Sequence, residues 1–442
     1  MSVDLVLKDG LVILEGKEVV RSISIDSGII HGIHEAGNEP SASKVIGCSG
    51  LYVLPGSIDM HVHMRDLGQV DKEDYATGTM AAAAGGVTTV ADMPNSDPPT
   101  FSLPDLEHKI AVAQEKRLVN VGFYTGVPTD VADFDSSVIP QILGIKIYPH
   151  SPLAKKVKYT RARVIECMQL SVEHRVPLLI HPNAAPRRIA KSKDDFFFLH
   201  SCENEVKSLN QFLAAKAQVG GKLHVCHVSC GTTARLIVEN RAEETLTAEV
   251  SPHHLFLHGD EFTHETGEAK MTPPLRSPFD NKSLQQALCG TCGIDVVASD
   301  HAPHSAEDKL LPFMDAPGGI PGLETTVPLM LTEVFEGRLS WVDYLRCCCS
   351  GPARILGLDA KGVLAEGFDA DIVIVSKEEW TIKGGNFYSK AKLTPFEGRR
   401  VLAKPRITIV EGDVVYEDGD FPIEGGVAGR VPVRRLMPRR KA

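Results

Sequence analysis

Eight short apolar runs, rich in β-branched residues, recur through the middle of the chain, and helix-length stretches such as LPDLEHKIAVAQEKR and ENEVKSLNQFLAAKAQ separate most of them. This alternation predicts parallel strands joined by helices. Eight such units predict an α/β fold of the TIM-barrel type, (β/α)₈, and a doubly wound sheet is the alternative that produces the same pattern. The runs cover residues 56–63, 86–94, 118–127, 143–149, 176–182, 221–229, 246–252 and 295–303.

Both ends of the chain differ from the middle. The first 54 residues contain short strand-like runs with turn signals at 9–10 and 26–28, and similar runs return in DADIVIVS and RRVLAKPRITIVEGDVVYEDG. Each end alone is too small to bury a core, so together they predict one small β-sandwich formed from both termini. The predicted domains are 1–54 for the N-terminal part of the sandwich, 55–360 for the barrel, and 361–442 for the C-terminal part of the sandwich with a tail.

Charge, apolar runs and cysteine content limit which partners and which cellular compartment the sequence predicts. The net charge of −10 disfavours a nucleic-acid or anionic-membrane surface. No run reaches about 18 uncharged apolar residues, which disfavours a membrane span, and the N-terminus lacks the pattern of a signal peptide.

The ten cysteines include three in a row at 347–349 and form no pair of CxxC motifs at zinc-finger spacing. They predict reduced, mostly buried thiols in a cytoplasmic protein.

The stretch GSIDMHVHMRD, residues 56–66, places His61, His63 and Arg65 at alternate positions after an apolar approach. Alternate residues of a strand share one face, so these side chains are expected to point the same way. Two histidines in this pattern also fit an ordinary core pair bonded to backbone carbonyls, so the motif alone does not decide between the two readings.

Other reactive residues fall in or near the ends of later runs, in LGIKIYP, VPLLIHP, LHVCHVS and DVVASDH. In a (β/α)₈ barrel the carboxyl ends of all eight strands meet at one face, so residues far apart in sequence converge there. Four histidines and an aspartate at that face form a set of nitrogen and oxygen ligands suited to zinc or a similar divalent ion. These five residues are His61, His63, His181, His227 and Asp300, and Lys146 lies within the fourth run.

The segments DMHVHMRD, KIY, LIHP, CHVS and SDHAPH together resemble the amidohydrolase superfamily and, within it, the dihydroorotases. The resemblance extends over nearly the whole chain and includes GPARILGL and GFDADIVIV after the barrel. It implies two divalent ions, expected to be zinc. Its implied ligands are His61 and His63 for one ion, His181 and His227 for the other, a carbamylated Lys146 as the bridge, and Asp300 as both ligand and general base.

The resemblance also implies a pocket for a substrate carboxylate, formed by Arg65, Asn95 and His304. In the loop APGGIPGLET, the backbone at Gly318 and Gly319 is implied to touch the substrate ring.

Two positions depart from the pattern of the family. His150, in KIYPHSP, stands where a small or polar residue is expected. It is either a spare ligand or an ordinary loop histidine, and we favour the loop histidine. Thr272, in KMTPPLR, stands where related enzymes commonly carry asparagine, which leaves one substrate contact undefined.

The implied activity is the reversible interconversion of dihydroorotate and N-carbamoyl-L-aspartate in pyrimidine synthesis, with a small-molecule substrate and a homodimer as the expected assembly. Hydantoinases, dihydropyrimidinases and allantoinases share the metal set, so another cyclic amidohydrolase is the alternative. A non-catalytic scaffold on the same barrel is disfavoured because every expected ligand is present.

Overall fold

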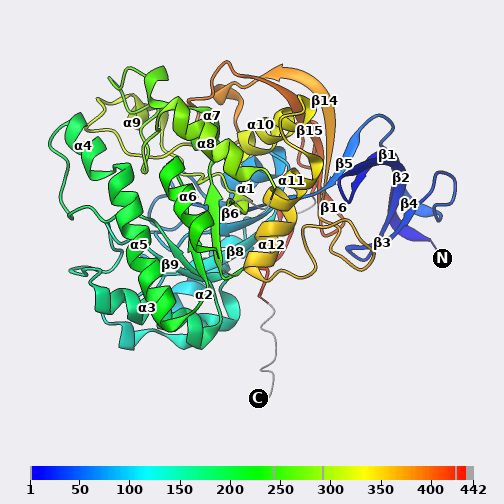
Figure 1. The fold of residues 1–442 in the computed structure, drawn as a ribbon. Coiled ribbons are helices and arrows are strands. Elements are labelled where there is room, and N and C mark those ends of the chain that lie inside the picture. The colour runs from blue at the N-terminus through cyan, green and yellow to red at the C-terminus, as the bar shows by residue number, and fades with distance from the viewer. Residues whose placement is uncertain (1, 242–243, 291–292, 424–425, 435–442) are drawn as a thin grey trace.

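The computed structural model describes residues 2–241, 244–290, 293–423 and 426–434. Its centre is a barrel of eight parallel strands, each paired with the next in chain order (Figure 1). Val62 and His301 form a parallel bridge that brings the first barrel strand beside the end of the last. Each predicted run contains one strand, so the predicted TIM-barrel fold is confirmed. The strands are β6 (Ser57–Val62), β7 (Val87–Asp92), β8 (Asn120–Thr125), β9 (Gly144–Ile147), β10 (Leu178–Ile180), β11 (Leu223–Val225), β12 (Leu246–Val250) and β13 (Val296–Val297).

Helices lie between and around the barrel strands (Figure 1). Ser102 and Ser277 begin two of them with capping boxes, in which each serine side chain accepts from a backbone N–H and an aspartate side chain accepts in return. No helix in the described ranges is long and apolar enough to span a bilayer. The helices are α1 (Tyr75–Ala84), α2 (Leu103–Gln114), α3 (Arg161–His174), α4 (Lys193–Leu199), α5 (Cys202–Val219), α6 (Gly231–Asn240), α7 (Pro252–Phe256), α8 (Pro278–Leu288), α9 (Ala306–Leu310), α10 (Leu323–Phe335), α11 (Trp341–Leu345) and α12 (Gly351–Leu356).

A second sheet combines strands from both ends of the chain, which confirms that the termini form one β-structure (Figure 1). Its strand order is β16-β15-β14-β5-β1-β2-β3, and β4 pairs with β1. Its own apolar core draws on both ends, for example Ile23 and Ile374. The domain boundaries at 54/55 and 360/361 stay a prediction. The strands are β1 (Val3–Leu14), β2 (Lys17–Asp26), β3 (Ile29–His34), β4 (Ala42–Gly47), β5 (Tyr52–Pro55), β14 (Ile372–Thr381), β15 (Arg400–Val410) and β16 (Asp413–Glu417).

The prediction that the cysteines are all reduced is wrong. Cys202, the first residue of α5, and Cys230, just before α6, form a disulfide. The two lie 28 residues apart on different elements, so no spacing motif signals the pair. The bond ties the loop after β11 to the start of α5. The three adjacent cysteines at 347–349 are buried thiols, as expected.

Candidate active site

A cavity of about 470 Å³ is lined by residues that follow the carboxyl ends of the barrel strands. Lys146 lies beneath its wall, fully buried, with its Nζ 5.1 Å from the centre of the Tyr148 ring. The structure therefore brings together the residues that the sequence singled out. Those in the cavity wall are His61, His63, Arg65, Asn95, His181, His227, Asp300, His304, Gly318 and Gly319.

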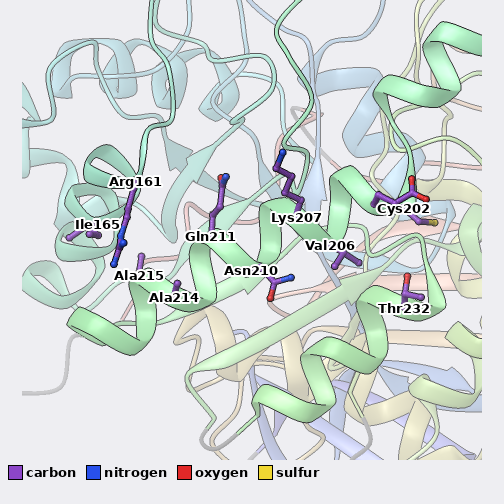
Figure 2. A pocket seen from close by; sticks show the side chains of 11 residues that line it. Arg161, Ile165, Cys202, Val206, Lys207, Asn210, Gln211, Ala214, Ala215 and Thr232 are labelled. Carbon is purple, nitrogen blue, oxygen red and sulfur yellow. The ribbon is translucent and has the colours of Figure 1, made fainter.

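A second hollow, of about 930 Å³, lies on the outer helices α3, α5 and α6 (Figure 2). Its polar lining includes Arg161, Lys207 and Glu203, and Cys202 of the disulfide lies at one end. It contains none of the predicted site residues and no histidine. The barrel cavity is therefore the candidate active site, although it is the smaller of the two.

His61, His63 and Asp300 form a compact group of metal-type donors. Oδ1 of Asp300 lies 3.3 Å from Nε2 of His61 and 3.1 Å from Nε2 of His63. All three side chains are buried, and their ligand atoms lie within 4.8 Å of one another. Burial alone would raise the pKa of Asp300, but the surrounding histidines, His61 foremost, hold it well below its usual value. The group can therefore offer an ionised carboxylate together with imidazole nitrogens.

Glu249, the last residue but one of β12, is a site residue that sequence reasoning missed. Its carboxylate is fully buried and accepts hydrogen bonds from Nδ1 of His61 and, at 3.0 Å, from Nε2 of His224. Burial would raise the pKa of Glu249, but these histidines hold it well below the ordinary value. A signal was available in the sequence, because Glu249 is the one charged residue in the buried strand LTAEV.

His181 and His227 form a second group. Nδ1 of His181 lies 2.9 Å from Nε2 of His227, and burial holds the pKa of both rings well below the ordinary value. Both imidazoles are therefore neutral, which is the form that binds metals. Nδ1 of His227 is buried and has no hydrogen-bond partner among the residues that the structure describes.

The surroundings of Lys146 also fit a modified amine. Its Nζ donates to Sγ of Cys226 at 2.8 Å, and no carboxylate in the described part of the chain lies within ion-pair distance. Carbamylation would give this buried position an anionic group able to bind cations. Together with the two histidine groups, the donor set fits a pair of divalent ions.

Arg65 and His304 lie side by side in the cavity wall, with Nη2 of Arg65 3.5 Å from Nε2 of His304. Strand β6 ends at Val62, so the strand argument covers His61 but not Arg65, whose left-handed backbone (φ 59°) carries it past the strand end. Nε of Arg65 and Nδ1 of His304 are buried without partners in the described residues. These groups remain available to an anionic ligand.

The two departures from the family pattern both reach the cavity. His150 lines the wall, with Nδ1 3.3 Å from the carbonyl oxygen of Ala185 and its ring edge-on to His200 at 5.0 Å between centres. His150 lies in the loop after β9, as expected, and this loop forms part of the cavity wall, so its role there stays a prediction. Thr272 lines the wall as well. Tyr148 and His200, which sequence reasoning did not single out, complete this side.

Comparison with known proteins places the chain in a family. The model of the amidohydrolase family matches residues 292–415, and the dihydro-orotase-like model matches residues 50–133. A dihydroorotase of Methanothermobacter thermautotrophicus is 35% identical over 93% of this chain and 95% of its own length. A dihydroorotase of Listeria welshimeri is 34% identical over 94% of this chain and 99% of its own length. This chain belongs to the dihydroorotase family.

Solved structures extend the comparison beyond the dihydroorotase family. An L-hydantoinase (dihydropyrimidinase) from Arthrobacter aurescens has a TM-score of 0.88 and 27% identity, covering 98% of this chain and 100% of its own. A dihydropyrimidinase from Brevibacillus agri, at 24% identity and a TM-score of 0.87 over 98% of this chain and 99% of its own, shows the shared fold alone. Because enzymes named for other substrates share the fold, the substrate of this dihydroorotase-family member has to be argued from the cavity wall.

Proposed function

We propose that this chain is a dihydroorotase, which hydrolyses (S)-dihydroorotate to N-carbamoyl-L-aspartate and closes the ring in the reverse direction. One observation carries the proposal: a single cavity combines the donor group of His61, His63 and Asp300 with the buried cation of Arg65. The donor group supports metal-assisted hydrolysis of a cyclic amide. The arginine supports recognition of a carboxylate on the ring. The pathway that needs this reaction is the de novo synthesis of pyrimidine nucleotides such as UMP.

The donor groups are proposed to hold two zinc ions, with Lys146 as a bridging carbamate. When bound, such ions polarise the amide carbonyl and lower the pKa of water. Asp300 is proposed to accept a proton from the attacking water and to return it to the leaving amide nitrogen, and its lowered pKa within the histidine group supports this role. Lys146, His181 and His227 are proposed to complete the set of ligands, which the contact between the two histidines and the burial of Lys146 support.

The remaining wall orients the substrate. Arg65 and His304 are proposed to bind the ring carboxylate together with Asn95, while the backbone of Gly318 and Gly319 contacts the ring. Closing the ring consumes one carboxylate and one proton, so lower pH favours dihydroorotate at equilibrium.

The second candidate is a hydantoinase or dihydropyrimidinase, because the Arthrobacter enzyme shares the fold at 27% identity. Rates of hydrolysis of dihydroorotate, dihydrouracil, hydantoin and allantoin by the purified protein separate the two. We expect dihydroorotate to be by far the best substrate. A preference for an uncharged ring would contradict the carboxylate pocket, and no hydrolysis of any ring by metal-loaded protein would favour a scaffold.

The proposal also includes a homodimer in the cytoplasm. Sedimentation measurements test the assembly, and cell fractionation tests the location. The Cys202–Cys230 disulfide is the observation that opposes a reducing compartment, because disulfides are rare in such compartments.

A further inference from the structure

Two buried lysines lie behind the loop that carries Gly318 and Gly319. This segment, residues 311–320, follows α9 and makes up most of the connection to α10, and it is called the glycine loop here. Lys270 and Lys309 are only 9% and 3% exposed. In the described part of the chain no carboxylate lies within 4.0 Å of either amine, so neither forms an ion pair there. Their partners are backbone carbonyl oxygens instead.

Lys270 holds the first half of the glycine loop through a single atom. Its Nζ donates to the carbonyl oxygens of Phe313 at 2.6 Å, Met314 at 3.3 Å and Ala316 at 2.7 Å. The same amine lies 5.3 Å and 5.0 Å from the centres of the Phe196 and Phe313 rings. Three carbonyls and two aromatic faces thus replace the water shell of the amine.

Lys309 fastens the second half of the loop. Its Nζ donates to the carbonyl oxygen of Lys270 at 2.8 Å and to that of Pro317 at 3.2 Å. The backbone N–H of Gly319 donates to the same carbonyl oxygen of Lys270 at 3.0 Å. Lys270 therefore contacts the loop in two ways. Its side-chain amine donates to the carbonyl oxygens of the first half, and its own carbonyl oxygen accepts from the N–H of Gly319 near the end of the loop.

The far side of the glycine loop meets the substrate wall. A Cβ at Gly319 would lie 2.3 Å from the carbonyl oxygen of Ala302 and 3.1 Å from Cδ2 of His304. Because the packing is this close, a shift of the loop changes the space around His304. His304 in turn lies beside Arg65, so the loop position affects the whole carboxylate-binding side.

We propose that Lys270 and Lys309 are positioning residues that set substrate specificity, by holding the glycine loop where Gly318, Gly319 and His304 recognise a carboxylate-bearing ring. This inference rests on the proposed function. In the described part of the chain, both amines contact backbone carbonyls, and that of Lys270 also contacts aromatic rings. None of these is a metal-type donor, so the lysines act on recognition of the substrate ring rather than on the metal centre.

The decisive variant is Lys270→Met, which keeps the unbranched apolar stem of the side chain and removes the amine with its donors. We expect KM for dihydroorotate to rise by about tenfold or more, because the loop must be ordered at the expense of binding free energy. The kcat should stay within about threefold and the bound metal unchanged, since the loop supplies binding rather than acid–base groups. The preference for dihydroorotate over dihydrouracil should fall with the rise in KM. Lys309→Met, which leaves the three carbonyl contacts of Lys270 in place, should change KM in the same direction.

Lys361→Met is the matched control. Lys361 is also buried, but it pairs with Asp369 and Asp371 beside the terminal sheet. This variant should lower the melting temperature and leave KM and the substrate preference unchanged. If Lys270→Met does not fold, Lys309→Met alone decides the question.

Two outcomes distinguish a failure of the positioning role of the lysines from a failure of the proposed dihydroorotase function. Stability losses in Lys270→Met and Lys309→Met with wild-type KM and preference would overturn the positioning role while leaving the dihydroorotase proposal intact. Failure of the wild-type protein to hydrolyse dihydroorotate would overturn the proposed function itself.

Discussion

The carboxylate of Glu249 accepts a hydrogen bond from Nδ1 of His61, although the two residues lie 188 positions apart in sequence. This contact makes Nδ1 the donor nitrogen of the ring, so the lone pair of Nε2 is left to face Asp300. Glu249 also accepts from His224 and from the backbone N–H of His227, which anchors the carboxylate itself. A buried glutamate therefore fixes the orientation of a proposed metal ligand.

Glu249→Gln should weaken metal binding. The amide accepts a hydrogen bond less strongly than the carboxylate, and loss of such a partner typically costs about 10- to 100-fold in metal affinity. Equilibrium dialysis against zinc measures the effect, and excess zinc should restore part of the activity. Glu411→Gln, at the terminal sheet, is the control. Unchanged zinc affinity would show that Glu249 has only a structural role.

The purified protein should contain close to two divalent ions per chain, as measured by elemental analysis. His61→Ala should lose activity and metal while keeping the circular dichroism spectrum of the wild type, because a polar ligand at a strand end contributes little to the apolar core. Fully active protein without metal would contradict the metal centre.

Asp300→Asn should lower kcat while preserving the shape of the side chain. Loss of a positioned acid–base group is worth about 10²- to 10⁴-fold, and weaker metal binding should add to the loss. Steady-state kinetics with saturating zinc separates the two contributions. A variant that keeps more than about a tenth of the wild-type rate would not fit the assigned role, given that range.

Arg65→Met should erase most of the preference for dihydroorotate over dihydrouracil. A site built around a charged group rejects the analogue without it by as much as ~10⁴-fold, because buried donors are left unpaired. The variant should lose activity on dihydroorotate and keep its activity on dihydrouracil. Arg346→Met, at a half-buried arginine that donates to the carbonyl oxygens of Ile294 and Leu288, should leave the ratio unchanged. An unaltered ratio in Arg65→Met would place the carboxylate contact elsewhere.

Lys309 should give the stability a recognisable pH dependence. Burial, followed by repulsion from Lys270, lowers the pKa of Lys309 from 10.5 to about 7. Between these values the unfolded chain binds the proton and the folded chain does not, so this group makes stability rise with pH. The free energy of unfolding of the wild type, relative to Lys309→Met, should therefore increase between pH 7 and pH 10. Urea titrations at both ends of that range test this, and a constant difference would contradict it.

The barrel could be predicted from the sequence because strands buried on both faces read as continuous apolar runs. Its site could be predicted for the same reason, since His61, His181 and Asp300 stand in or just after such runs. The lengths of the strands were harder to predict from the sequence. Strand β13 covers only Val296–Val297, because the chain soon bends through a left-handed backbone at Asp300 (φ 48°).

Other parts of the site depend on neighbours that local sequence does not reveal. Lys270 bonds to backbone carbonyl oxygens, which every residue possesses, so no motif marks its partners. Glu249 stands alone in an apolar run, and its role appears only when His61 and His224 lie beside it. Cys202 and Cys230 come together only because α5 begins beside the loop after β11.

Strand β14 lies between β5 and β15 in the terminal sheet, and Ile372 pairs with Pro55. The ribosome therefore synthesises β5 first, then the whole barrel, and only then β14, although β5 and β14 are hydrogen-bonded neighbours in the folded sheet. Until residue 372 emerges, one edge of β5 offers unpaired N–H and C=O groups to any other extended chain. A message truncated within the barrel would yield a protein that keeps this edge open and is prone to aggregate through it.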